Sequence, residues 1–215
     1  MRKQTPQVDL LRRTASRPRS GIVILWVILI VPVLFFLFGA VVDISRVWLA
    51  RIELTNALEA AALSGVKTWG EAGVTANNNP LTSPALRQNA RTHAVTAAAA
   101  NTVIGQDPAH PENTVVVSLN RNESVGSTPN DNTFPTGELV LGQITASGNS
   151  FTFTASTAPA NNNEFAVHTQ KTMTIYSIWT KIFGIPLGPY QITSGAVAMY
   201  DGVQPRIAFV TSYAP

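Results

Sequence analysis

The chain has 215 residues, enough for one domain with an appendage, and it carries only 15 basic and 12 acidic residues. Six of the basic residues lie among the first twenty, so the formal charge of +3 hides a net acidic remainder. This distribution argues against a nucleic-acid-binding protein, and the absence of cysteine argues against a zinc module or a disulfide-stapled mini-protein.

Residues 1–20 form a basic tail with too little apolar content to fold alone. The four cations nearest to the apolar stretch that follows are Arg12, Arg13, Arg17 and Arg19. Positive charge beside a membrane span is retained on the cytoplasmic side, where it also faces anionic lipid. We therefore interpret residues 1–20 as a cytoplasmic tail that sets the membrane topology.

Residues 21–42, from Gly21 to Val42, are 22 consecutive residues without a charge. As a helix this stretch would be about 33 Å long, enough for a hydrocarbon core of about 30 Å. Pro32 lies near its middle, where membrane helices tolerate a kink. The stretch predicts a transmembrane helix. A cleaved signal peptide is the alternative, although the stretch exceeds the ~7–15 residues of a typical signal-peptide core and no A-x-A cleavage site closes it.

The positive-inside rule gives the orientation of this predicted span. Six basic residues precede it, whereas only Arg46 and Arg51 follow it within twenty residues. We expect a single-pass protein of the bacterial cytoplasmic membrane, with a cytoplasmic N-terminus and an extracytoplasmic, periplasmic domain.

Residues 43–66 are predicted to continue the helix outside the membrane, because apolar residues recur at three- and four-residue steps and proline is absent. Ala57, Ala61 and Gly65 form a ridge of small side chains that would let another backbone approach closely. The ridge is interpreted either as a contact with a partner or as packing on the protein's own globular part. Gly65, with the glycines after it, predicts the end of the helix.

Asp43 directly follows the predicted span. A carboxylate there costs little if it reaches headgroup water and much if it is buried without a partner. Two interpretations remain open: Asp43 pairs with an arginine of a neighbouring span, or it is a solvated boundary residue close to Arg46. Asp43 and Arg46, with the small-residue ridge, form the predicted assembly interface.

The N-terminal part of the sequence resembles a known family. A basic stretch, a glycine that opens a proline-containing span, and the segments 43–51 (DISRVWLAR) and 54–65 (LTNALEAAALSG) are similar to the N-terminal module of TadE/TadG-like proteins, over about residues 17–66. The resemblance implies a pilin-like or pseudopilin-like component of Flp-type (tight-adherence, Tad) pilus assembly. Processed members carry a glutamate five residues after the glycine, whereas this chain has Trp26 there. The departure implies that the N-terminal tail is retained.

Residues 67–215 are predicted to form an extracytoplasmic α+β domain. Ser83-Pro84 is a typical helix start, and short runs rich in Val, Ile, Thr and aromatic residues follow it. These runs predict an antiparallel sheet with the helices on one face, at 115–119, 138–145, 151–154, 167–178, 190–199 and 207–211. The apolar patch 178–187 is interpreted as a strand connection or core segment, with a membrane-touching loop as the alternative.

The sequence contains no recognisable catalytic motif. The three histidines, His93, His110 and His168, form no metal-ligand pair, and the carboxylates Asp107, Glu112, Glu123 and Asp131 are spread over predicted loops. We expect a non-catalytic protein without cofactor or metal. The rival hypothesis is a membrane-tethered periplasmic enzyme or ligand-binding domain whose site forms only in the fold, from His168 or His110 and loop carboxylates.

The sequence therefore favours a membrane-anchored component of Flp/Tad pilus assembly that acts through protein–protein contacts. The expected partners are the lipid bilayer and other pilus-assembly membrane proteins or pseudopilins, in a homo- or hetero-oligomer, and not nucleic acid. A surface adhesin fits the Asn/Thr-rich loops as well, but it explains less about the long N-terminal helix.

Overall fold

The structure, a computed structural model, describes residues 20–75, 83–122, 136–147, 150–156, 165–184, 188–210 and 212–214. The chain divides into two compact units, Met1–Ala40 and Val41–Pro215. The predicted topology residues Arg12, Arg13, Arg17 and Arg19 lie outside the described residues. So do two of the loop carboxylates, Glu123 and Asp131.

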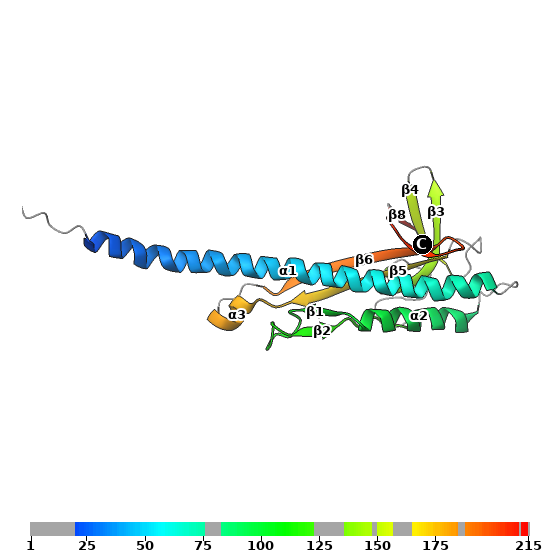
Figure 1. The fold of residues 1–215 in the computed structure, drawn as a ribbon, viewed down its shortest axis with the longest axis horizontal. Helices are drawn as coiled ribbons and strands as arrows, with labels where there is room; N and C mark the ends of the chain where they lie inside the picture. The colour runs from blue at the N-terminus through cyan, green and yellow to red at the C-terminus, as the bar shows by residue number, and fades with distance from the viewer. Residues whose placement is uncertain are drawn as a thin grey trace, which may run out of the picture. The chain divides into compact units, whose positions relative to one another are not determined.

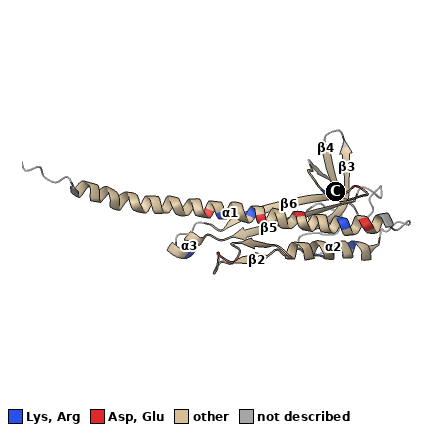
Figure 2. Ribbon diagram, in the orientation of Figure 1, with Lys and Arg blue, Asp and Glu red and all other residues tan. Residues whose placement is uncertain are grey.

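Helix α1 extends from Ser20 to Thr75 and contains the predicted span with Pro32 inside it. In the first unit its large apolar side chains, from Ile22 to Phe38, are all exposed. The sequence has no charged residue from Gly21 to Val42, and Figure 2 draws this part of α1 in tan alone. By length and composition the helix is apolar enough to cross a membrane.

The prediction that this helix ends near Gly65 is wrong, because the glycines serve close packing instead. A Cβ atom added at Gly65 would lie 3.1 Å from the Cβ atom of Ala94. At Gly70 it would lie 2.3 Å from the ring of Tyr200. Glycine at these positions lets the second helix and the sheet reach the α1 backbone, so α1 continues to Thr75.

Helix α2, Pro84–Ala99, begins where the sequence predicts, with Ser83 as the N-cap residue and proline in the first turn. Its buried side holds three alanines, Ala90, Ala94 and Ala98, which join the main core. Arg91 is fully buried, and its Nη1 atom donates a hydrogen bond to the carbonyl oxygen of Leu139. This contact fastens α2 to the sheet.

The strands confirm the α+β prediction with largely antiparallel pairing. β1 (Thr102–Ile104) and β2 (Thr114–Val116) form a two-stranded sheet. A six-stranded sheet has the order β7-β6-β5-β3-β4-β8 and pairs its strands antiparallel, apart from the parallel pair β4–β8. Its strands are β3 (Leu139–Ser147), β4 (Ser150–Ala155), β5 (Phe165–Ile175), β6 (Tyr190–Tyr200), β7 (Pro205–Ala208) and β8 (Ser212–Ala214).

The main core lies between the helices and one face of this sheet, as predicted. β5 and β6 run alongside the second part of α1, with α2 beside them (Figure 1). Trp69 of α1 packs edge-on against Phe165 of β5, with ring centroids 5.0 Å apart. A smaller core around Phe153 and Val197 covers the other face near β3 and β4.

The segment after β5 forms a short helix, α3 (Ile178–Phe183), where the sequence predicts that the strand continues to Ile178. The Ser177 hydroxyl caps the helix by accepting a hydrogen bond from the backbone N–H of Thr180, at 3.2 Å. Gly184 ends it in the left-handed conformation, with φ 67°, which favours glycine. The sequence signal that could have identified α3 is this pair of caps, six residues of helix apart.

Candidate functional site

The candidate site lies where the sheet meets the beginning of the second unit. β5 runs antiparallel to α1 along its length. Midway, the Thr169 hydroxyl of β5 donates a hydrogen bond to the carbonyl oxygen of Leu58, at 2.9 Å. Two residues after β5 ends, the Ser177 hydroxyl reaches Asp43. The strand therefore brings the start of α3 to the residue that directly follows the charge-free stretch of α1.

Asp43 is buried, with 4% of its surface exposed, and its Oδ2 atom accepts a hydrogen bond from the Ser177 hydroxyl. The interpretation of Asp43 as a solvated boundary residue is wrong. A buried carboxylate needs a partner. The other interpretation placed that partner on a neighbouring span, whereas the structure supplies it within the chain, as Ser177. Since Ser177 also caps α3, one carboxylate fixes both the end of β5 and the start of α3 on α1.

Arg46, one helical turn after Asp43, holds the loop between β1 and β2. Its Nη2 atom donates a hydrogen bond to the carbonyl oxygen of Pro111. Burial lowers the pKa of Arg46, and the nearby carboxylates of Asp43 and Glu112 oppose this shift. The predicted interface residues Asp43 and Arg46 are thus brought together, and both make contacts inside the protein.

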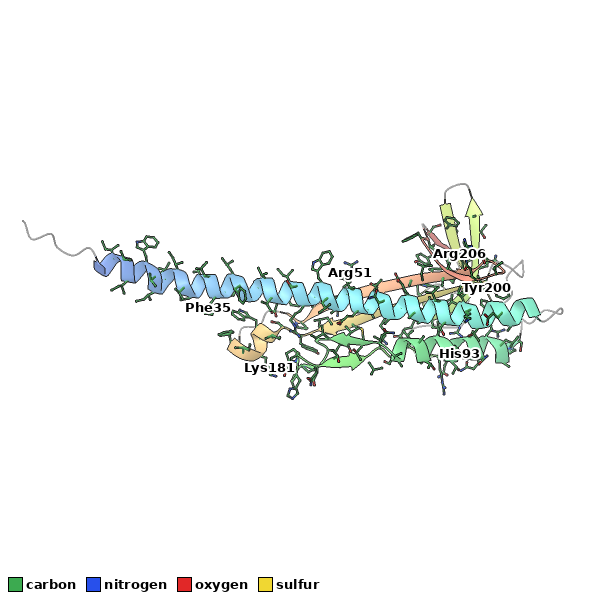
Figure 3. All side chains as sticks on the ribbon, in the orientation of Figure 1. Phe35, Arg51, His93, Lys181, Tyr200 and Arg206 are labelled. Carbon is green, nitrogen blue, oxygen red and sulfur yellow. The ribbon has the colours of Figure 1, made fainter. Side chains whose placement is uncertain are left out.

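Lys181 of α3 connects to the same loop. Its Nζ atom lies 2.8 Å and 3.1 Å from the two carboxylate oxygens of Glu112 (Lys181 is labelled in Figure 3). The hydrogen bond from Lys181 is the main reason that the pKa of Glu112 falls to about 2. Asp43, Arg46, Glu112, Ser177 and Lys181 are named here the junction cluster. It joins α1, the β1–β2 loop and α3.

The small-residue ridge lies inside the protein. Ala57 and Ala61 are fully buried in the main core, and Gly65 faces Ala94 of α2. The ridge therefore packs on the protein's own globular part, which is the second of the two interpretations of its spacing. Small side chains here let α2 and the sheet approach α1 closely.

The opposite side of α1 carries large apolar side chains that remain exposed in the second unit. They are between 45% and 64% exposed and recur at three- and four-residue steps. We name this surface the outer face of α1; it comprises Val41, Ile44, Trp48, Leu49 and Ile52. The sequence contained a signal for it, because bulky apolar residues lie in the first turns after Asp43 and alanines dominate the later turns.

The histidines of the rival hypothesis do not converge. His168 is buried between the rings of Phe153 and Tyr213, with centroids 5.5 Å and 4.9 Å away. His110 lies 3.3 Å from a Glu112 oxygen in the junction cluster, and His93 is exposed on α2 (Figure 3).

His168 borders a hollow of about 480 Å³, and no carboxylate is among the described residues that line it. The other lining residues are Arg51, Thr136, Gln170, Thr193, Ser194, Gly195 and Tyr213. Within the described part of the chain, no three His, Asp or Glu side chains gather as metal ligands would. His168 therefore meets no carboxylate of the described residues at this hollow, whereas His110 lies beside the loop carboxylate Glu112.

Comparison with known proteins identifies α1 as the informative element. Residues 21–69 match the family model described as "Putative Flp pilus-assembly TadE/G-like". No curated protein and no solved structure matches the chain. The family match confirms the resemblance seen in the sequence and supports a role in Flp/Tad pilus assembly. It lies entirely within α1, and it includes Asp43, Arg46 and both sides of the helix.

Proposed function

We propose that this chain is a membrane-anchored, non-catalytic component of a Flp/Tad-type pilus assembly system, acting as a minor pseudopilin-like subunit or envelope anchor. The observation that carries the proposal is the family match over α1, the element that includes both the apolar stretch and the outer face. One side of this helix packs on the protein's own sheet and second helix, and the other side exposes bulky apolar residues. Such an exposed apolar surface is suited to assembly with a second protein.

The proposed topology is single-pass in the bacterial cytoplasmic membrane. The apolar stretch 21–42 spans the bilayer, and the basic residues before it remain in the cytoplasm by the positive-inside rule. The α+β domain is then periplasmic. This orientation gives the domain access to pilus subunits as they leave the membrane.

The part of the outer face farthest from the span, Leu49 and Ile52, is the proposed assembly surface, and its occupant is a helix of another pilus-assembly membrane protein or pseudopilin. Headgroups extend about 5–7 Å beyond the hydrocarbon core, whereas Ile52 lies nine residues, or about 13 Å, after Asp43. Lipid therefore does not cover Ile52, which is 52% exposed. A partner anchored in the same membrane presents its own helix at this height.

Photo-crosslinking tests this surface. A photoreactive amino acid replaces Ile52 in cells that express the piliation system, and Lys67 serves as the control because it is exposed on the same helix farther from the span. We expect Ile52 to capture a Flp/Tad membrane component, identified by mass spectrometry, and Lys67 to capture none. If Ile52 captured only a second copy of this chain, the assembly would be a homo-oligomer and the proposed hetero-oligomer would be wrong.

Piliation tests the function itself. Ile52→Arg places a charge on the outer face and leaves the core intact, so we expect loss of pili at a normal protein level. Lys67→Ala should leave piliation unchanged. Normal piliation in a strain that lacks the whole gene would contradict the proposed function, and normal piliation in Ile52→Arg alone would contradict only the proposed surface.

A further inference from the structure

α3 is an apolar projection that the proposed function does not use. None of its residues is buried, and Ile182 and Phe183 are 62% and 53% exposed. Phe183 packs against Trp179, with ring centroids 4.1 Å apart, so the two aromatic rings form one surface. A six-residue helix that exposes this much apolar surface needs a cover that the described part of the chain does not provide.

The height of α3 relative to the membrane follows from β5 and the junction cluster. β5 runs along α1 toward the membrane end, passing Leu58 at Thr169 and reaching Asp43 at Ser177. Asp43 is the first residue after the stretch proposed to span the bilayer. The headgroup region extends about 5–7 Å beyond the hydrocarbon core, so α3 begins within that region.

We infer that α3 is a second membrane contact, with Ile182 and Phe183 inserted at the boundary between headgroups and acyl chains of the outer leaflet. Aromatic residues with a nearby lysine are typical of segments at this depth. Lys181 suits the position, because its ammonium group is held by Glu112 on the domain side while its neighbours point to lipid. The inference rests on the membrane anchoring proposed above and is independent of any pilus partner.

A second contact has a mechanical consequence. A single spanning helix leaves a domain free to tilt with respect to the bilayer, whereas a second contact with the leaflet limits that tilt. The junction cluster makes the link stiff, because Asp43 joins α3 to α1 through Ser177. Contact between α3 and lipid therefore limits the tilt of α1 and holds the outer face at a set height above the bilayer.

Spin labels measure this contact directly in the full-length protein. The chain lacks cysteine, so each introduced cysteine is the only labelling site. Single variants Ile182→Cys and Phe183→Cys carry a nitroxide and are reconstituted in vesicles of phosphatidylethanolamine and phosphatidylglycerol. Collision rates with oxygen and with a water-soluble nickel chelate report the depth of each label. Leu29→Cys in the span and Val203→Cys are the controls.

Val203 is a matched control because it is also apolar and exposed, at 83%, but follows the opposite end of β6. That strand of 11 residues is about 35 Å long. We expect the oxygen-to-nickel ratio at 182 and 183 to be severalfold higher than at 203 and below the ratio at 29. In an Ile182→Asp background, the label at 183 should shift toward the aqueous value.

Three results would overturn the inference. Labels at 182 and 183 as aqueous as the label at 203, with a lipid-exposed label at 29, would leave the anchor in place and remove the α3 contact. Labels shielded from both reagents would assign the surface to a second copy of the chain. An aqueous label at 29 would remove the membrane anchor as well.

Discussion

The two sides of α1 in the second unit differ in size and in surroundings. The inner side combines alanines with leucine, valine and tryptophan, and its alanines Ala50, Ala57, Ala61 and Ala62 are fully buried. The outer face carries isoleucine, leucine, valine and tryptophan, all exposed. On this helix the side that the protein covers itself holds most of the small apolar residues, together with Leu54, Leu58 and Trp69, and the outer face is left open.

This difference separates a contact within the chain from a contact with a partner, two cases that give the same sequence pattern. Small side chains at four-residue spacing permit close approach of any backbone, whether from a partner or from the same chain. Here they receive α2 and the sheet. Substitutions on the inner side should therefore reduce stability, and substitutions on the outer face should change assembly. The four predictions that follow are ordered by their expected effect on stability.

Ala61→Leu should have the largest effect. Ala61 is fully enclosed in the main core, so the added methylene groups overpack it and lower the free energy of unfolding by about 3 kcal/mol, at the upper end of the usual range. Hydrogen exchange of the full-length protein in nanodiscs, followed by mass spectrometry at β5 and β6, measures the opening free energy.

Asn56→Leu is the matched control, because Asn56 is exposed on the same helix. We expect its opening free energy to remain within about 0.5 kcal/mol of the unmodified chain. If Ala61→Leu kept full stability and removed piliation, the ridge would be a partner contact after all, and the comparison of the two sides would fail.

Asp43→Ala should have the next largest effect, about 2 kcal/mol, because it removes a hydrogen bond to a charged group that is buried. Ser177→Ala removes the same bond together with the cap of α3. A double-mutant cycle on the opening free energies measures the interaction energy between Asp43 and Ser177. Strictly additive losses would mean that Asp43 and Ser177 do not depend on one another, and α3 would not be fastened to α1 through this bond.

Ile52→Ser should change stability by less than about 0.5 kcal/mol, since Ile52 is 52% exposed and outside both cores. The same exchange measurement tests this directly on the purified protein without partners. A loss comparable to that of Ala61→Leu would mean that the outer face packs on this chain itself. It would then be no assembly surface.

Several elements were predictable from the sequence because each rests on a local signal. The charge-free stretch, the Ser83-Pro84 start of α2 and the alternating residues of β5 need only neighbouring residues to be recognised. Glycine was ambiguous. Gly65 and Gly70 suggested the end of a helix, but their role is to admit Ala94 and Tyr200, and contacts between distant segments are not visible in a local pattern.

The junction cluster lay beyond sequence reasoning for the same physical reason. Asp43 and Ser177 are 134 residues apart, and only the register of β5 along α1 brings them together. The sequence indicated that Asp43 needs either a partner or water, but it did not show which of the two Asp43 contacts. The side of α1 that the sheet covers was equally undetermined, because periodicity finds two faces without showing what each one contacts.

The smallest effect on stability concerns Glu112, whose pKa is lowered from 4.5 to about 2 chiefly by the hydrogen bond from Lys181. Because the pKa of Glu112 is lower in the folded state, its stabilising contribution is present above pH 4.5 and is lost as the pH falls toward 2. Both side chains are substantially exposed, so solvent screening keeps this contribution small.

Carbon-13 NMR of the Glu112 carboxyl group in the full-length protein should show a midpoint near pH 2. Lys181→Gln should return the midpoint toward 4.5, and Lys181→Arg should retain most of the shift. A midpoint near 4.5 in the unmodified chain would mean that Lys181 is free of Glu112, and α3 would then be held to α1 by Ser177 alone.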